Sequence, residues 1–275
     1  MASISTTRPW LLVTDVDDTL LGDDDALARL AEALNHHHGV RLVLNSSRPL
    51  QSVVRSLDDL PFRLGPDGMV GALGTEVEMG GEPFGHWQAR FAGWDRAPVD
   101  RAMARLGCPA HPHEYQTPFK ASFSVDAARR REAEEAVAAT GLAARVVYSG
   151  ESSFDVIPAN AGKEAPLDFL AEHFRVPADQ VVAAGDSAND AGLLRAVPHA
   201  ILVGNATAEL IEALDADRAT GPTSGGDRGA GSSTDPGPKA GPTGSPTHRY
   251  RAAAPHAGGI IEGLVELGIL GLRAS

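Results

Sequence analysis

Short apolar runs alternate with amphipathic stretches through the first third of the chain, which is the pattern of buried strands joined by helices. The runs at 10–13, 40–45 and 68–73 are apolar enough to be strands covered on both faces. Between them, apolar residues recur at helical spacing over 26–38 and 49–60. This order predicts a parallel sheet whose strands end at one common edge.

The pattern changes at about residue 81 and changes back at about residue 157. A Gly80-Gly81 turn predicts a hairpin and is followed by helical stretches over 86–93 and 97–106. The other expected elements are strands at 119–125, 145–148 and 153–157 and an alanine- and glutamate-rich helix over 127–140. We therefore expect residues 81–156 to form a small α+β domain, inserted into a larger one and folded over its active edge.

Regular α/β alternation returns after residue 157. The expected elements are helices over 162–174, 190–197 and 206–214 and strands at 181–184 and 200–203. Residues 219–247 are rich in Gly, Pro, Ser and Thr and almost lack large apolar groups, so we expect a disordered loop. Structure should return at 249–251 and end in a helix over 257–267. The larger domain is thus predicted to be discontinuous, comprising residues 1–80 and 157–275.

Composition narrows the class of protein. The chain has 275 residues, of which 43% are hydrophobic, and a formal net charge of −12, which argues against nucleic acid and anionic membranes as partners. No apolar run is long enough to span a bilayer, and residues 1–8 do not resemble a secretion signal. The single cysteine, Cys108, excludes an internal disulfide. We expect a cytoplasmic protein.

Two carboxylates, Asp15 and Asp17, directly follow the strand at 10–13. Ligands of open parallel sheets bind outside the carboxyl ends of the strands. There, one carboxylate can attack phosphorus to form a transient acyl phosphate, while the other protonates the leaving oxygen and then activates water. Magnesium would neutralise the phosphate and hold the nucleophile. The alternative is an acidic turn in which Asp17 or Asp18 only caps the next helix.

Further polar residues are predicted at the same edge. In Asn45-Ser46-Ser47-Arg48, a hydroxyl and backbone N–H groups can hold phosphate oxygens, although the segment could instead be a helix cap. Lys163 can pair with a nucleophilic carboxylate and offset charge on the transferring phosphoryl group. Asp186 can ligate Mg²⁺ directly, whereas Asp190 can bind it through water or orient Lys163.

Together these segments resemble, in their usual order, the four signature motifs of the haloacid dehalogenase (HAD) superfamily: Asp15-x-Asp17-x-Thr19, Ser46, Lys163 and Gly185-Asp186-Ser187-x-Asn189-Asp190. The resemblance implies a Rossmann-like α/β core with a central parallel sheet and an inserted α+β cap. It makes Asp15 the nucleophile and Asp17 the general acid/base, and an acid at position 17 favours hydrolysis. The implied phosphate-binding residues are Ser46, Ser47, Lys163 and Asn189, and the implied Mg²⁺ ligands are Asp15, Asp17 through its backbone carbonyl, Asp186 and Asp190.

A narrower resemblance, to sucrose-6-phosphate phosphatases, covers nearly all of the chain that is expected to be ordered. It is carried by Gly74-Thr75-Glu76, residues 119–123, 203–206 with 209–210, and 250–252 with 257–260. It implies that the core binds phosphate while the cap recognises the sugar. The candidate substrate contacts are Arg48, Thr75, Glu76, Lys120, Ser122 and Asp155. This chain has Asn45-Ser46-Ser47-Arg48 where Ser-Thr-Gly-Arg is more usual.

The resemblance implies a small-molecule sugar phosphate, sucrose 6-phosphate, as the substrate and a sugar-phosphate synthase as a candidate partner. Other glycosyl phosphates, such as mannosylfructose phosphate and mannosyl-3-phosphoglycerate, are alternative substrates because cap geometry and hydrogen bonds set selectivity. A sugar-phosphate sensor that binds without turnover is an alternative from another class. Asp17 and Lys163 favour an enzyme over a sensor, and the sequence sets no oligomeric state.

Overall fold

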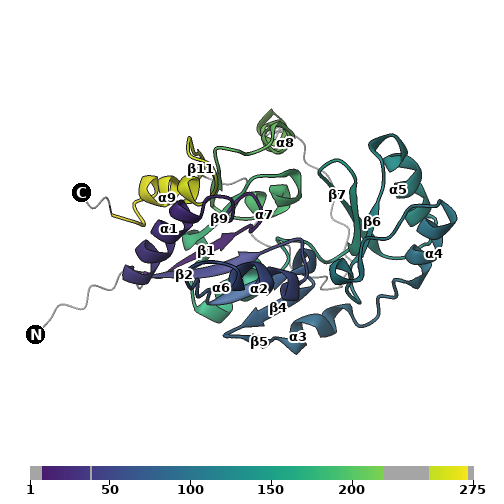
Figure 1. The fold of residues 1–275 in the computed structure, drawn as a ribbon, viewed down its shortest axis with the longest axis horizontal. Helices are drawn as coiled ribbons and strands as arrows, with labels where there is room; N and C mark the ends of the chain where they lie inside the picture. Colours follow the sequence, from purple (N-terminus) through teal and green to yellow (C-terminus); the bar gives the residue numbers. More distant parts are fainter. Residues whose placement is uncertain (1–7, 38, 220–247, 272–275) are drawn as a thin grey trace, which may run out of the picture.

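The computed structural model describes residues 8–37, 39–219 and 248–271 (Figure 1). Within these ranges, an eight-stranded sheet has the order β11-β10-β9-β1-β2-β3-β4-β5. Its parallel strands are β1 (Trp10–Thr14), β2 (Val40–Asn45), β3 (Gly68–Gly71), β9 (Val181–Gly185), β10 (His199–Leu202) and β11 (His248–Arg251). The expected hairpin at Gly80-Gly81 joins β4 (Glu76–Met79) to β5 (Glu82–Pro83) and continues the sheet in antiparallel pairing.

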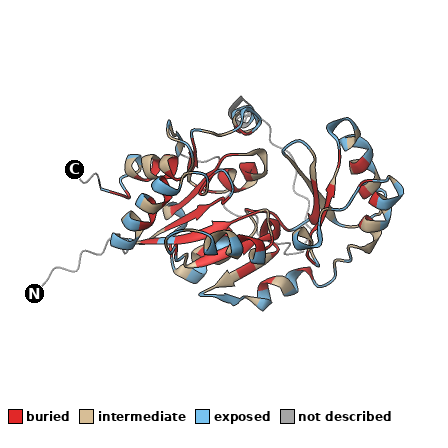
Figure 2. Ribbon diagram, viewed as in Figure 1, coloured by how far each residue is buried: buried red, intermediate tan, exposed pale blue. Residues whose placement is uncertain are grey.

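Helices cover both faces of this sheet. Successive residues of a strand point to opposite sides, so a continuous apolar run needs a cover on each side. On β1, Leu11 and Val13 belong to a core formed with α6 (Leu167–Phe174), α7 (Ala191–Arg195) and α8 (Ala208–Ala219). Leu12 belongs to the opposite core, formed with α1 (Asp24–His36), α2 (Leu50–Asp58) and α9 (His256–Glu266). Figure 2 shows the strands buried between these helices, which explains their nearly continuous apolar runs.

A smaller antiparallel sheet, with the strand order β6-β8-β7, lies at the opposite end of the molecule from the chain termini (Figure 1). Its strands are β6 (Ala121–Ser124), β7 (Ala144–Ser149) and β8 (Ser153–Pro158), and it packs with α4 (Ala97–Arg105) and α5 (Arg130–Ala138). Met103, Phe123 and Val137 lie in the separate apolar core between these elements. Trp87 and Phe91, around the short helix α3 (Gly85–Gln88), instead pack with the large sheet.

The element boundaries differ from the expected ones in a few places. The helix expected over 162–174 begins only at Leu167, directly after Pro166, because proline suits the start of a helix and not its interior. Lys163 therefore lies in a turn. The helices expected over 86–93, 127–140 and 190–197 each divide into a 3-10 turn and an α-helix.

Part of the expected disordered loop, residues 220–247, lies outside the described residues, and α8 extends to Ala219. Among the helices that the structure describes, none has the length and apolar character of a membrane span.

The turn after β3 lies against the loop that precedes α6, and the closest approach is at Gly74. Gly74 has a φ of +83°, and a Cβ added to it would lie 2.0 Å from the carbonyl oxygen of Gly162. A residue without a Cβ is therefore required at this position. Asn45 Nδ2 also donates to the carbonyl oxygen of Lys163 in this loop, at 2.8 Å. These two contacts fix the backbone that carries Lys163.

We expect Gly74→Ala to lower the free energy of unfolding by about 2–3 kcal/mol, because the backbone must move to relieve the contact with Gly162. The matched control is Gly80→Ala, since Gly80 has a φ of +59° and open space around its Cα. That variant should lose only about 1–2 kcal/mol, the cost of a left-handed alanine. Urea denaturation measures both, and a loss in Gly74→Ala no larger than that in Gly80→Ala would contradict the role of the contact.

Candidate active site

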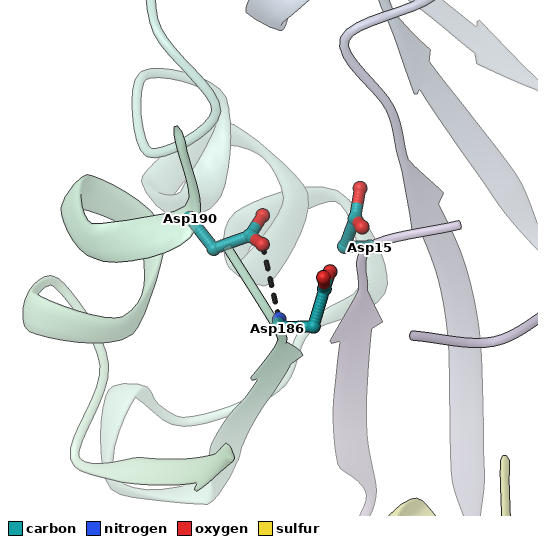
Figure 3. A group of neighbouring side chains, drawn as sticks. All are labelled: Asp15, Asp186 and Asp190. Carbon is teal, nitrogen blue, oxygen red and sulfur yellow. Dashed lines mark hydrogen bonds between the residues drawn. The ribbon is translucent and has the colours of Figure 1, made fainter. Parts of the chain in front are cut away.

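Three buried carboxylates meet at the carboxyl end of the large sheet (Figure 3). Asp15 follows β1, Asp186 follows the neighbouring strand β9, and Asp190 lies in the 3-10 turn before α7. Each offers an oxygen, and these atoms all lie within 4.8 Å of one another. The parallel pairing of β1 with β9 thus brings together acids that are far apart in the sequence.

The ammonium group of Lys163 lies between two of these carboxylates. Its Nζ donates to Asp15 Oδ1 at 2.5 Å and to Asp190 Oδ1 at 2.6 Å, and the Lys163 side chain is 1% exposed. Burial disfavours the charged ammonium, but the attraction of Asp15 and Asp190 outweighs it and raises the pKa of Lys163 above its usual value. Lys163 therefore remains charged at neutral pH.

Burial has the opposite consequence for the acids. It raises the pKa of Asp15 to about 6, against the attraction of Lys163, and repulsion from Asp186 adds to the rise. Burial and repulsion from Asp15 raise the pKa of Asp190 to about 6 as well, while Lys163 opposes the rise. Burial also raises the pKa of Asp186, although a hydrogen bond from the Thr19 hydroxyl, 2.8 Å long, works against it.

The charges of this cluster do not balance within the protein. Three carboxylates face a single ammonium group, which leaves an excess of negative charge when all three are ionised. A divalent cation would offset it, and carboxylate oxygens are the donors that hard divalent cations prefer. The residues present therefore fit such a cation.

Asp190 has a partner for each of its two oxygens. Oδ1 accepts from Lys163, and Oδ2 accepts from the backbone N–H groups of Asp186 at 3.2 Å and Ser187 at 3.1 Å. The dashed line in Figure 3 marks the bond to Asp186. Of the two roles open to Asp190 from sequence, this geometry favours the orientation of Lys163.

Asp17 lies at the mouth of the site. Its side chain is 49% exposed, and its Oδ2 accepts from Arg48 Nε at 2.8 Å. Arg48 is held in turn by Ser56, whose Oγ accepts from Nη1 at 2.9 Å. Neither Asp17 nor Asp18 caps a helix, because α1 is capped by Asp23, whose carboxylate accepts from the N–H of Ala26. The capping alternative is thereby excluded.

A cavity of about 320 Å³ opens above the carboxylates. Asp15, Asp17, Asp186, Ser47 and Asn189 line it, whereas Ser46 is fully buried and its Oγ accepts from the N–H of Arg48 at 3.0 Å. The lining residues to which the sequence analysis assigned no site role are Asp18, Ser149, Gly150, Ser187, Ala188, Thr207 and Glu209.

Some of these additional lining residues could have been found from the sequence, and others could not. Thr207 and Glu209 follow β10, which was expected to end at the same edge, so the strand order could have pointed to them. Ser149 is the last residue of β7, and Gly150 follows it in the connection to β8 of the small sheet. Only the position of the small sheet relative to the large one brings them to the cavity.

A second cavity, of about 340 Å³, lies between the two sheets and shares Ser47 with the first. Three of the candidate substrate contacts line it, namely Arg48, Lys120 and Asp155, together with His111, Pro112, Tyr115 and Ser153. Lys120 Nζ lies 3.0 Å from Asp155 Oδ1 and donates to Ser122 Oγ at 2.7 Å. Ser122 therefore contacts Lys120 without lining the cavity itself.

The other two candidate contacts, Thr75 and Glu76, do not line either cavity. The Thr75 hydroxyl donates to the carbonyl oxygen of Ala72 at 3.0 Å. The Glu76 carboxylate accepts from the N–H of Leu50 at 2.8 Å, and burial raises its pKa. Both side chains stabilise the turn after β3 and the start of α2.

Comparison with solved structures identifies the fold. The sucrose-phosphatase of Synechocystis sp. PCC6803, solved with sucrose and phosphate, aligns with a TM-score of 0.76 and 24% identity over 95% of this chain and 98% of that one. A HAD subclass IIB sugar phosphatase aligns with a TM-score of 0.64 and 14% identity over 95% and 100% of the two chains. The fold is thus that of the HAD phosphatases, with a Rossmann-like core and a cap.

Sequence comparison gives the family. The model of the sucrose-6F-phosphate phosphohydrolase family matches residues 8–223, and the chain belongs to this family. Mannosylfructose-phosphate phosphatase of Agrobacterium fabrum is 32% identical over 75% of this chain and 88% of that protein. Sucrose-phosphatase 1 of Nicotiana tabacum is 27% identical over 77% of this chain, which spans about half of its length (54%). The chain is therefore placed among phosphoric monoester hydrolases that act on sugar phosphates.

We expect Lys163→Met to lower the free energy of unfolding of the metal-free protein by about 3–5 kcal/mol at pH 7, because Asp15 and Asp190 lose their buried partner. The loss should be smaller at pH 5. Both carboxyl groups have a pKa of about 6, so they are largely protonated there, and a neutral carboxyl group does not need the ammonium.

Urea denaturation at both pH values measures this difference. The control, Arg131→Met, breaks the exposed ion pair with Glu135 and should cost less than about 1 kcal/mol at either pH. If Lys163→Met lowers the free energy of unfolding equally at pH 5 and pH 7, the charge of Lys163 does not stabilise the ionised forms of Asp15 and Asp190.

Proposed function

We propose that this protein hydrolyses a disaccharide phosphate monoester, sucrose 6-phosphate, to sucrose and inorganic phosphate, with Mg²⁺ as cofactor and an aspartyl-phosphate intermediate on Asp15. The observation that carries the proposal is the buried Asp15–Lys163 pair at the floor of a polar cavity, in a chain of the sucrose-6F-phosphate phosphohydrolase family. Buried pairs of this kind prepare a nucleophile for an anionic substrate, since the ammonium stabilises both.

In the proposed reaction, Asp15 attacks phosphorus and the bond between phosphorus and the sugar oxygen breaks. Asp17 gives its proton to that oxygen and then accepts a proton from the water that cleaves the acyl phosphate. Lys163 keeps Asp15 ionised and offsets charge on the phosphoryl group, while Ser46, Ser47 and Asn189 bind its oxygens. When bound by Asp15, Asp186 and the backbone carbonyl of Asp17, with Asp190 behind them, Mg²⁺ would supply further neutralisation.

The sugar is proposed to occupy the second cavity. Residues 1–80 and 157–275 would form the catalytic core, and residues 81–156 the cap that contributes to sugar recognition. Arg48, Lys120 and Asp155 line this cavity with charged groups that can bind sugar hydroxyls. Ser122, Thr75 and Glu76 would act by holding Lys120 and the turn after β3.

A second candidate substrate is mannosylfructose phosphate. It is favoured by the 32% identity to the Agrobacterium fabrum enzyme, of which this chain covers 88%. Sucrose and mannosylfructose both contain a fructose unit and differ in the second sugar, so groups on the cap would have to discriminate between glucose and mannose.

Release of inorganic phosphate from a panel of esters tests the reaction and the substrate together. The panel comprises sucrose 6-phosphate, mannosylfructose phosphate, mannosyl-3-phosphoglycerate, glucose 6-phosphate and fructose 6-phosphate, each with Mg²⁺ and with EDTA. We expect kcat/KM to be at least about tenfold higher for sucrose 6-phosphate than for the others and activity to be lost in EDTA. If kcat/KM is highest for mannosylfructose phosphate, the second candidate substrate is the correct one. If no ester is hydrolysed, the protein is a sugar-phosphate sensor that binds without turnover.

Two variants test the intermediate. Asp15→Asn should lower kcat by at least about a thousandfold, because an amide cannot attack phosphorus, and leave the circular dichroism spectrum unchanged. Asp17→Asn should retain the nucleophile but lack the acid/base, so ³²P from labelled p-nitrophenyl phosphate, whose leaving group departs without a proton, should accumulate on it. Asp179→Asn, at an exposed ion pair with Arg8, is the control for both. Labelling of Asp15→Asn to the level of Asp17→Asn would rule out Asp15 as the acceptor.

A further inference from the structure

The residue after Asp17 has an unusual backbone conformation. Asp18 has a φ of +59°, in the left-handed region, which costs a residue with a side chain about 1–2 kcal/mol. Such strain persists where the surrounding structure holds it, and it is concentrated at functional sites. Its flanking residues, Asp17 and Thr19, both point their side chains into the site, to Arg48 and Asp186 respectively. The contacts of Asp18 therefore bear on the chemistry.

The carbonyl oxygen of Asp18 accepts two hydrogen bonds from distant parts of the chain. Asn205 Nδ2, in the loop after β10, donates to it at 2.7 Å. His256 Nδ1, in the first residue of α9, lies 2.9 Å from the same oxygen and must carry a proton to bond to it. Asn205 Oδ1 also accepts from the backbone N–H of His256 at 3.0 Å, so the two donors hold each other.

The neighbouring turn leaves space for the ring of His256 in this position. His256 itself has a left-handed φ of +51°. Its ring lies against Gly22, where an added Cβ would be 2.6 Å from Nδ1. Gly22 has a φ of +124°, so the turn that carries Asp17 leaves space for the ring at a position that disfavours any side chain.

The hydrogen bonds from Asn205 and His256 to the Asp18 carbonyl affect Asp17 through one torsion angle. The φ of Asp18 sets the angle between the carbonyl group of Asp17 and that of Asp18. Holding the Asp18 carbonyl while φ stays positive therefore fixes the direction of the peptide group between Asp17 and Asp18. If Asp18 relaxed to a negative φ, that peptide group would rotate and carry Asp17 with it.

We propose that Asn205 and His256 are positioning residues for the general acid/base: they hold the turn at Asp18 so that Asp17 is directed at the leaving oxygen of the substrate. This inference rests on the proposed function. His256 also lies outside the residues matched by the family model, 8–223. The C-terminal part of the described chain would thus complete the site with a residue that supports the acid.

The test uses leaving groups that differ in their need for an acid. An alcohol such as the sugar must be protonated as it departs, whereas p-nitrophenolate leaves readily without a proton. We expect His256→Ala and Asn205→Ala to lower kcat/KM for sucrose 6-phosphate roughly tenfold or more, and for p-nitrophenyl phosphate by less than about threefold. Phenyl phosphate, with an intermediate leaving group, should fall in between.

His256→Asn is the conservative variant. An asparagine amide can donate from the position of Nδ1 and tolerates a left-handed φ, so it should restore most of the lost activity toward sucrose 6-phosphate. Arg175→Ala is the matched control, since Arg175 has a φ of +55° and lies at the end of α6. It should leave the ratio between the esters unchanged.

An equal fall for all three esters would overturn the inference, because it would show a general structural defect or a loss of the Mg²⁺ ligand at the Asp17 carbonyl instead of a loss of the acid. Unchanged kinetics in His256→Ala and Asn205→Ala would overturn it as well. If the wild-type protein cleaves the aryl esters but not sucrose 6-phosphate, the proposed substrate is wrong while the inference is still decided by phenyl against p-nitrophenyl phosphate. Thermal unfolding of each variant separates a loss of fold from a loss of positioning.

Discussion

The buried ammonium of Lys163 keeps its charge because two carboxylates from different parts of the chain converge on it, at 2.5 Å for Asp15 and 2.6 Å for Asp190. Without that convergence, burial would favour the neutral amine, and the acids would take up protons. Each partner is held from behind: Asn45 and Gly74 fix the backbone at Lys163, and backbone N–H groups hold Asp190. The surrounding strand ends, tight turns and close glycine contacts therefore serve one electrostatic arrangement.

Two adjoining cavities lie next to this group of buried charges. The first cavity has buried charges at its floor and Asp17 at its mouth, while the second is lined by charged groups from both sheets. Ser47 lines both cavities, and Arg48 lines the second while it pairs with Asp17. The segment after β2 thus connects the two cavities, the first proposed to hold the phosphate and the second proposed to hold the sugar.

Much of the fold could be predicted because it depends on local pattern. Apolar runs at 10–13, 40–45 and 181–184 became the central strands, since parallel strands buried on both faces need continuous apolar sequence. The helix expected from residue 162 begins at Leu167, because helical spacing alone does not show where a proline will begin the helix. Thr75 and Glu76 stay predicted substrate contacts, and the sequence does not show that their side chains bond to nearby backbone.

By itself, then, the sequence determined which residue types stand near the ends of the strands, because strand period and turn chemistry are local properties. It thereby identified the acids, the lysine and the class of chemistry. Tertiary structure alone decided which of those groups touch. It brought Asp190 to Lys163, Arg48 to Asp17, and Asn205 with His256 to the carbonyl group of Asp18. Those contacts join residues far apart along the chain. No local pattern records the angle at which two elements pack or the position of the small sheet relative to the large one.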